Sequence, residues 1–318
     1  MDLTVIGSGR WGSFLAYYLN SLGHRVTLCG REGSARFEAL CQSRANDLLT
    51  LPPEIRLTTD LREAAQNEIL LISVASQGLR ALGERLGALG LTDRTLVLCM
   101  KGLEEGSGLR LSEVISSCLE PSDTVAVWLG PGHVQEFIRG VPNCMVIDSA
   151  SQEAKGRLVD LFSGPLIRFY YGTDLIGNEI GAASKNVIGI AAGMLDGFGL
   201  STLKGALMSR GTREIARLIR AMGGNELSAY GLCHLGDYEA TVFSPYSHNR
   251  RFGECFVRGE PYRELAEGYF TVKALTRLEE TYGAELPICR AVYRILYENA
   301  SAENELHTLF GRSLKREF

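Results

Sequence analysis

The chain begins with a strand-like run, a glycine-rich turn and a helix-like segment. Residues 3–6 read Leu-Thr-Val-Ile, and residues 7–12 have the spacing G-x-G-x-x-G. Apolar residues then recur at helical spacing from Phe14 to Leu19. Glycines in such a turn let the backbone approach a pyrophosphate, and the first amides of the helix attract its charge. This order predicts a dinucleotide-binding Rossmann unit, with a purely structural glycine turn as the alternative.

The ribose of a dinucleotide is expected at the end of the next strand, residues 25–29. An acidic residue there favours NAD(H), whereas an arginine can face the 2′-phosphate of NADP(H). The chain has Gly30-Arg31-Glu32 at this point, so both cofactors stay open and Arg31 favours NADP(H). The cofactor-binding residues predicted in this region are Gly7, Ser8, Gly9, Arg10, Trp11, Gly12 and Arg31.

Further β-rich apolar runs continue through the first half of the chain. Because they are nearly continuous, they predict a doubly wound, mostly parallel sheet covered by helices on both faces. Ligands of such sheets bind at the carboxyl ends of the strands, where Lys101 and Gly130 are found. The predicted strands are 55–58, 69–74, 95–99, 124–129, 144–147 and 166–170, with helices at 79–89 and 109–119.

The second half of the chain has a different pattern. Amphipathic stripes at 207–222, 265–278 and 288–295 indicate core-packing helices, and strand-like runs are few. At 318 residues the chain also exceeds the size at which one core usually suffices. We therefore predict an α/β Rossmann domain, residues 1–173, followed by an all-helical domain, residues 174–318.

A glycine ridge opens this second half. Residues 177–193 read GNEIGAASKNVIGIAAG, so glycines recur every four positions with Lys185 in their middle. On a helix these positions share one face. Each interior glycine costs about 1 kcal/mol relative to alanine, so the ridge implies close approach of another segment or a ligand. Lys185 is then drawn into a poorly solvated place; a lysine that extends outward to water is the alternative. The ridge consists of Gly177, Gly181, Gly189 and Gly193.

A dense polar segment covers residues 231–251. Asp237 and Thr241 are four positions apart and would share a helical face. The run from Ser247 to Arg251 offers several donors suited to an anion. An N-capped surface loop is the alternative.

Composition excludes several classes of function. With 45% hydrophobic residues, 22% charged residues and a net charge of -4, the chain has no broad attraction for nucleic acid or anionic membranes. No apolar run approaches the ~18 residues of a spanning helix, and because Met1 leads directly into a strand-like run we expect no signal segment. We expect a cytoplasmic protein without stable membrane insertion. The eight cysteines lack C-x-x-C spacing, so we expect reduced thiols and no metal site.

Motifs along nearly the whole chain, in the right order, resemble those of the NAD(P)-dependent glycerol-3-phosphate dehydrogenases. The resemblance implies a helical domain of the 6-phosphogluconate dehydrogenase C-terminal-like type, an active site in the cleft between the domains, and a homodimer. The motifs are the glycine turn with Trp11, Lys101-Gly102-Leu103-Glu104, Gly130-Pro131, Gly181-Ala182-Ala183-Ser184-Lys185-Asn186, Leu235-Gly236-Asp237, Ser247-x-Asn249 and Glu267-Gly268.

The resemblance also implies a reaction, the reversible NAD(P)H-dependent reduction of dihydroxyacetone phosphate to sn-glycerol 3-phosphate, a glycerophospholipid precursor. Lys185 matches the general acid/base, and Lys101 and Asp237 are the other implied catalytic residues. The implied substrate contacts are Lys101, Gly130, Lys185, Asp237, Thr241, Ser247, His248 and Asn249. Lys101, His248 and Glu267 are further implied cofactor contacts.

The chain departs from the family pattern where the substrate phosphate is held. His248 stands where an arginine is usual, and a neutral histidine is a poorer anion partner than a guanidinium. Arg250 or Arg251 could substitute. A dehydrogenase acting on another small phosphorylated or carboxylated hydroxy compound is therefore an alternative function, and a non-catalytic dinucleotide sensor is another.

Overall fold

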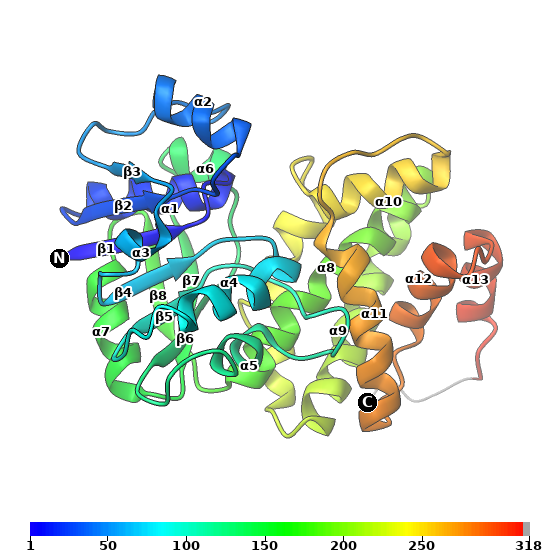
Figure 1. Ribbon diagram of the computed structural model, residues 1–318. Helices are drawn as coiled ribbons and strands as arrows, with labels where there is room; N and C mark the ends of the chain where they lie inside the picture. The colour runs from blue at the N-terminus through cyan, green and yellow to red at the C-terminus, as the bar shows by residue number, and fades with distance from the viewer. Residues whose placement is uncertain (314–318) are drawn as a thin grey trace. The chain divides into compact units, whose positions relative to one another are not determined.

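The computed structural model describes residues 1–313, which form two compact units (Figure 1). The N-terminal unit contains Met1–Lys101 and Leu109–Glu179. The helical unit contains the loop Gly102–Gly108 and the described chain from Ile180 onward.

The N-terminal unit is built on one eight-stranded sheet with the order β3-β2-β1-β4-β5-β6-β7-β8. The order of the first six strands is that of doubly wound dinucleotide-binding folds. All neighbouring strands are parallel except β6 and β7, so the prediction of a mostly parallel sheet is confirmed. The strands are β1 (Asp2–Ile6), β2 (Arg25–Cys29), β3 (Arg56–Thr58), β4 (Ile69–Ile72), β5 (Thr95–Leu98), β6 (Thr124–Leu129), β7 (Asn143–Ser149) and β8 (Ile167–Tyr171).

Helices bury the central strands of this sheet. Alternate strand residues such as Val5, Leu28 and Trp128 join helix residues such as Phe14 and Phe162 in one core. Strand β4 is buried along its whole length, which explains its unbroken apolar sequence. The helices are α1 (Arg10–Ser21), α2 (Ala35–Ser43), α3 (Leu61–Ala64), η1 (Ser76–Gly78), α4 (Leu79–Gly87), α5 (Leu111–Ser116), α6 (Val134–Ile138) and α7 (Gln152–Phe162).

Helix α8 (Leu175–Gly197) leads from the N-terminal unit into the helical unit, whose described residues form no strand. Among the residues described, none of the helices combines the length and the apolar character that crossing a membrane requires. The remaining elements are η2 (Ser201–Leu203), α9 (Lys204–Ala221), η3 (Glu226–Tyr230), η4 (Leu235–Asp237), the π-helical turn η5 (Glu239–Phe243), α10 (His248–Arg258), α11 (Glu267–Tyr282), α12 (Pro287–Tyr297) and α13 (Ala302–Phe310).

Two predicted helices start two residues later than expected. Helix α5 starts at Leu111 because the Glu113 side chain accepts a hydrogen bond from the Arg110 backbone amide at 3.0 Å. Helix α11 starts at Glu267, so Leu265 lies outside it and is 50% exposed. The interpretation of Leu265 as a core residue is therefore wrong.

Three glycines of the ridge, Gly181, Gly189 and Gly193, are covered by residues of the segment 234–254. A Cβ atom on Gly193 would lie 1.8 Å from the backbone oxygen of Arg250, and one on Gly181 would lie 3.0 Å from Cβ of His234. A side chain at Gly193 would therefore have to displace backbone. The predicted close approach is thus an approach of protein to protein, which offsets the low helix propensity of glycine.

Candidate active site

The glycine turn between β1 and α1 combines two packed glycines with an open one. Gly7 has a φ of +111°, and a Cβ on it would lie 2.1 Å from the Ser73 carbonyl oxygen. A Cβ on Gly12 would lie 1.8 Å from the Gly7 carbonyl oxygen. No described atom outside the turn lies within 4 Å of the Cβ position of Gly9. Gly7 and Gly12 thus hold the turn together, while the space beside Gly9 can admit a pyrophosphate.

The first turn of α1 offers backbone amides to a ligand. Its N-cap, Gly9, has no side chain that could bond to them. Amides at such a position attract phosphate groups. The side chains of the two following residues are engaged by protein groups, since Arg10 Nη2 lies 2.7 Å from Asp47 Oδ2 and the Trp11 ring centroid lies 5.4 Å from that of Phe14. The turn would therefore hold a cofactor mainly through its backbone.

Arg31 lies in the loop after β2, with its side chain exposed. The backbone at Gly30 packs closely against Phe37, because a Cβ on Gly30 would lie 2.1 Å from the Phe37 ring. Glu32 is exposed beside it. An arginine and an acid are thus both present at the expected ribose position, and Arg31 stays a predicted contact.

The structure brings two predicted residues together at the carboxyl edge of the sheet. Lys101 follows β5, and its Nζ donates to the Gly130 carbonyl oxygen at 2.6 Å. Gly130 follows β6 and has a φ of +128°, which favours glycine. The pair places an ammonium at the edge where doubly wound folds bind their ligands.

A buried cluster of three predicted residues lies in the helical unit. Lys185 Nζ is 2.9 Å from Asp237 Oδ2 and donates to Thr241 Oγ1 at 2.6 Å. Thr241 Oγ1 donates in turn to the Asp237 carbonyl oxygen at 2.7 Å. The exposed fractions of the Lys185 and Asp237 side chains are 9% and 1%. The ammonium is therefore paired and largely removed from water, as the glycine ridge predicts.

Asp237 and Thr241 reach Lys185 from two different turns. The sequence predicts one helical face for both, but Asp237 ends the 3-10 helix η4 and Thr241 lies in the π-helical turn η5. Single π-helical turns are frequent at functional sites. Thr241 is held against the ridge, since a Cβ on Gly189 would lie 2.8 Å from Thr241 Cγ2.

His234 supports this cluster and is not among the predicted site residues. Burial lowers the pKa of His234 to about 4, so its ring is neutral at pH 7. A neutral ring has one donor and one acceptor. Nδ1 can donate to the Gly181 carbonyl oxygen at 2.8 Å, while Nε2 accepts from the Tyr238 hydroxyl at 2.8 Å. The available signal was the position of His234 directly before Leu235-Gly236-Asp237.

Ser247 and Asn249 bond to protein groups that fix the start of α10. Ser247 Oγ accepts from the Arg250 backbone amide at 3.3 Å, as a helix N-cap. Asn249 Nδ2 donates to Asn186 Oδ1 at 3.0 Å, and its Oδ1 accepts from the Gly268 amide at 2.9 Å. Asn186 is a further candidate that sequence analysis did not select, although it directly follows the lysine of the ridge.

The remaining predicted residues lie at helix starts. His248 begins α10, and its Nδ1 lies 2.7 Å from the Tyr262 hydroxyl. Glu267 begins α11. Arg250 Nη1 lies 2.6 Å from Asp196 Oδ2, in a largely buried ion pair. Arg250 and Arg251 stay candidates to replace the family arginine.

A Rossmann sheet with an open glycine turn, followed by a helical unit that buries a lysine beside a carboxylate, defines a nicotinamide-dinucleotide-dependent dehydrogenase. The family model of the NAD-dependent glycerol-3-phosphate dehydrogenase N-terminus matches residues 2–155, and that of the C-terminus matches residues 174–307. The chain belongs to this family.

Curated relatives match the chain over its whole length. The glycerol-3-phosphate dehydrogenase [NAD(P)+] of Thermoanaerobacter sp. (strain X514) is 36% identical over 329 residues, covering 100% of this chain and 99% of the relative. That of Prosthecochloris aestuarii is 35% identical over 332 residues, covering 100% of both chains. The predicted family and enzyme class are confirmed.

Solved structures share the fold. The glycerol-3-phosphate dehydrogenase of Coxiella burnetii matches with a TM-score of 0.91 at 28% identity, covering 98% of this chain and 99% of that one. The 2-dehydropantoate 2-reductase of Methylococcus capsulatus matches with a TM-score of 0.61 at 17% identity, covering 99% of each chain. The second likeness concerns the fold alone. The predicted fold class is confirmed.

Proposed function

We propose that this protein reversibly reduces dihydroxyacetone phosphate to sn-glycerol 3-phosphate with NAD(P)H. The observation that carries the proposal is the buried cluster of Lys185, Asp237 and Thr241, in a chain that belongs to the glycerol-3-phosphate dehydrogenase family. Relatives that match the whole chain bear the name of this activity.

The chemistry requires a proton donor at the ketone oxygen. A bound nicotinamide dinucleotide supplies the hydride, which leaves negative charge on that oxygen. The Lys185 ammonium can stabilise this charge and donate the proton, acting as general acid. The Asp237 carboxylate pairs with the ammonium at 2.9 Å. The Thr241 hydroxyl accepts a hydrogen bond from the ammonium at 2.6 Å, which fixes its orientation. In the reverse direction the neutral amine accepts the proton.

The test is oxidation of NADH and NADPH with dihydroxyacetone phosphate by the purified full chain. We expect turnover, and we expect Lys185→Met to lower kcat by about a hundredfold or more, because the proton donor is lost. Binding of the reduced cofactor, measured by fluorescence, should stay close to that of the wild type. Absence of turnover with both cofactors would sink the proposed function, and an active Lys185→Met variant would show that Lys185 is not the acid/base.

A matched control separates chemistry from stability. Lys155 is a buried lysine of the N-terminal unit, and its Nζ lies 3.0 Å from Asp148 Oδ1. Lys155→Met breaks a comparable buried ion pair outside the candidate site. We expect it to lower the free energy of unfolding while leaving kcat of the folded fraction within about threefold of the wild type.

We further propose a preference for NADPH over NADH, supported by Arg31 at the end of β2. Arg31→Ala should raise KM for NADPH about tenfold and leave KM for NADH nearly unchanged, since only NADPH carries the 2′-phosphate. Arg62→Ala, which removes an exposed arginine of α3, serves as the control. Equal effects of Arg31→Ala on both cofactors would contradict this preference.

His248 is the reason to test an alternative substrate. Its ring bonds to Tyr262 in the position where the family arginine is expected. The alternative, another small phosphorylated or carboxylated hydroxy compound, is favoured if such a compound gives a higher kcat/KM than dihydroxyacetone phosphate in the same assay. The cytoplasmic homodimer implied by the resemblance stays a prediction, and light scattering on the purified protein would give its mass.

A further inference from the structure

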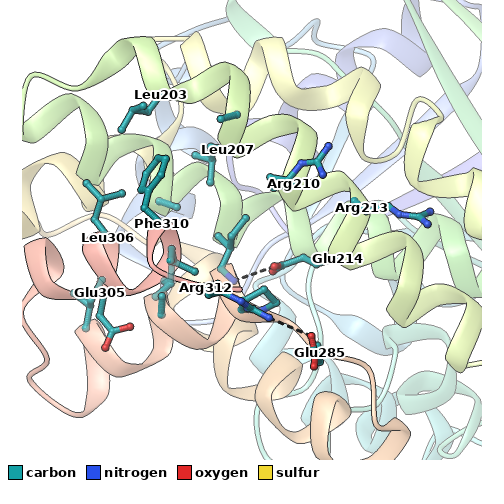
Figure 2. A pocket seen from close by; sticks show the side chains of 18 of the residues that line it. Leu203, Leu207, Arg210, Arg213, Glu214, Glu285, Glu305, Leu306, Phe310 and Arg312 are labelled. Carbon is teal, nitrogen blue, oxygen red and sulfur yellow. Dashed lines mark hydrogen bonds and ion pairs between the residues drawn. The ribbon is translucent and has the colours of Figure 1, made fainter. Parts of the chain in front are cut away.

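The helical unit contains a large groove that none of the candidate site residues lines. Its volume is about 900 Å³, and it lies between α8, α9, α12 and α13 (Figure 2). This volume falls in the range of sites that hold small organic molecules. The question is which molecule its lining would fit.

One end of the groove is apolar. Leu203 and Leu207 lie beside Leu306 and Phe310 of α13, as Figure 2 shows. Phe310 is 66% exposed although it is large and apolar, and α13 has no buried residue. Helix α12 adds Ala291, Val292 and Ile295 to the lining, α8 adds Met194 and Leu195, and Phe198 follows the end of α8. Covering Phe310 and the partly exposed Leu203, Leu207 and Leu306 with an apolar molecule would remove their exposed surface from water, which is favourable.

The lining of α9 changes from apolar to basic along the helix axis. Figure 2 shows Arg210 and Arg213 following Leu207 along α9. The rise from residue 203 to residue 213 is about 15 Å at 1.5 Å per residue. The chain as a whole has a net charge of -4, so this basic stripe is a local feature. The lining arginines of α9 are Arg210, Arg213, Arg217 and Arg220, which share one helical face.

The acidic residues of the lining are engaged by other groups. Glu214 accepts from the Ile288 and Cys289 backbone amides at 2.9 and 3.0 Å. Glu285 pairs with Arg312 at 3.2 Å (Figure 2). Glu305 pairs with Arg294. The lining contains five arginines and these three acidic residues, so positive charge predominates in it.

We propose that the groove binds an amphipathic anion with a single aliphatic chain, of the fatty-acid class. The chain would lie between α9 and α13, beside Leu207 and Phe310. The anionic head would lie at Arg210 and Arg213, about 5 to 9 Å further along α9 than Leu207. An aliphatic amine would meet like charge there, and a short-chain anion would leave the apolar end uncovered.

The test is calorimetric titration of the purified full chain with laurate, a single-chain anion. We expect saturable binding of one laurate per chain. Dodecylamine, which has the same tail and a positive head, and butyrate, which has the same head and a short tail, should each bind at least about tenfold more weakly. Equal binding of laurate and dodecylamine, or no binding of laurate, would overturn the proposal.

Two variants locate the site. Leu306→Glu places a charge at the apolar end, and the double variant Arg210→Gln, Arg213→Gln removes charge from the basic end. Each should weaken laurate binding about tenfold or more. The matched controls are Leu227→Glu, at an exposed leucine outside the groove, and Arg258→Gln, at an exposed arginine of α10, neither of which should change binding.

Light scattering and circular dichroism complete the test. All variants should keep the helical content of the wild type, so that loss of binding cannot be ascribed to unfolding. If Leu306→Glu lowers the mass of the ligand-free protein and laurate does not bind the wild type, the groove is an interface with a second copy and the proposal is wrong. Laurate binding that survives both groove variants would also overturn it.

Discussion

His234 fixes the turn that carries Asp237 without placing a charge beside Lys185. Its ring bonds to Gly181 of α8 and to Tyr238, and burial lowers its pKa to about 4. A histidine in an unfolded chain has a pKa of about 6.5, so the unfolded state takes up the proton first as the pH falls. The stability that His234 contributes is therefore present above pH ~6.5 and is lost as the pH falls towards 4.

This linkage predicts a pH-dependent difference between the wild type and His234→Gln. Glutamine can keep both hydrogen bonds but does not titrate. Between pH 7.5 and pH 5 the free energy of unfolding of the wild type should fall by about 2 kcal/mol more than that of the variant. Urea unfolding followed by circular dichroism measures both, with His307→Gln on the surface of α13 as the control. Parallel curves for the wild type and His234→Gln would contradict the prediction.

At the same scale, the sequence predicts residue types better than it predicts side-chain partners. Lys185, Asp237 and Thr241 are found together, as the family resemblance implies. Ser247 and Asn249 stay predicted substrate contacts, and their atoms bond to the α10 backbone, to Asn186 and to Gly268. These partners depend on packing between helices distant in sequence, which no local pattern contains.

Helix α8 illustrates the scale of the element. Its four-residue glycine period predicts a helix with one small-residue face, and the structure confirms that helix over Leu175–Gly197. The period does not say what approaches the face. In the structure α10 approaches this face, and each helix contributes a glycine. The backbone of Arg250 packs against Gly193 of α8, and the Ile190 carbonyl oxygen lies 2.1 Å from where a Cβ atom on Gly253 of α10 would be. Two helices thus meet through glycines on both sides.

The close approach predicts opposite effects for two glycine-to-alanine substitutions. Gly193→Ala would place Cβ 1.8 Å from the Arg250 carbonyl oxygen and should lower the free energy of unfolding by about 2 kcal/mol or more. Gly205→Ala, in α9, has no described atom outside its own helix segment within 4 Å of the new Cβ and should raise it by about 0.5–1 kcal/mol. Thermal unfolding of both variants provides the measurement. A Gly193→Ala protein as stable as the wild type would show that α10 can move away from α8.

For the whole molecule, the order of elements was predictable and the finer arrangement was not. The strand, glycine turn and helix at the start of the chain predict a doubly wound sheet, which the strand order confirms. The antiparallel pairing of β7 with β6 is not predictable from their apolar sequences, because strand direction depends on the connection between them. The groove beside α13 is likewise not predictable from the spacing of apolar residues, since Leu306 and Phe310 are spaced like ordinary core residues.

The loop Gly102–Gly108 has a consequence for dividing this protein into fragments. It belongs to the helical unit, where Lys273 Nζ lies 2.6 Å from Glu105 Oε1 and a Cβ on Gly108 would lie 3.7 Å from the Ala274 carbonyl oxygen. Yet it is flanked on both sides by residues of the N-terminal unit. A single cut near residue 179 would therefore separate the loop from the helix it packs against. A fragment of the helical unit that keeps these contacts therefore needs the loop attached to it, so the two units have to be engineered together.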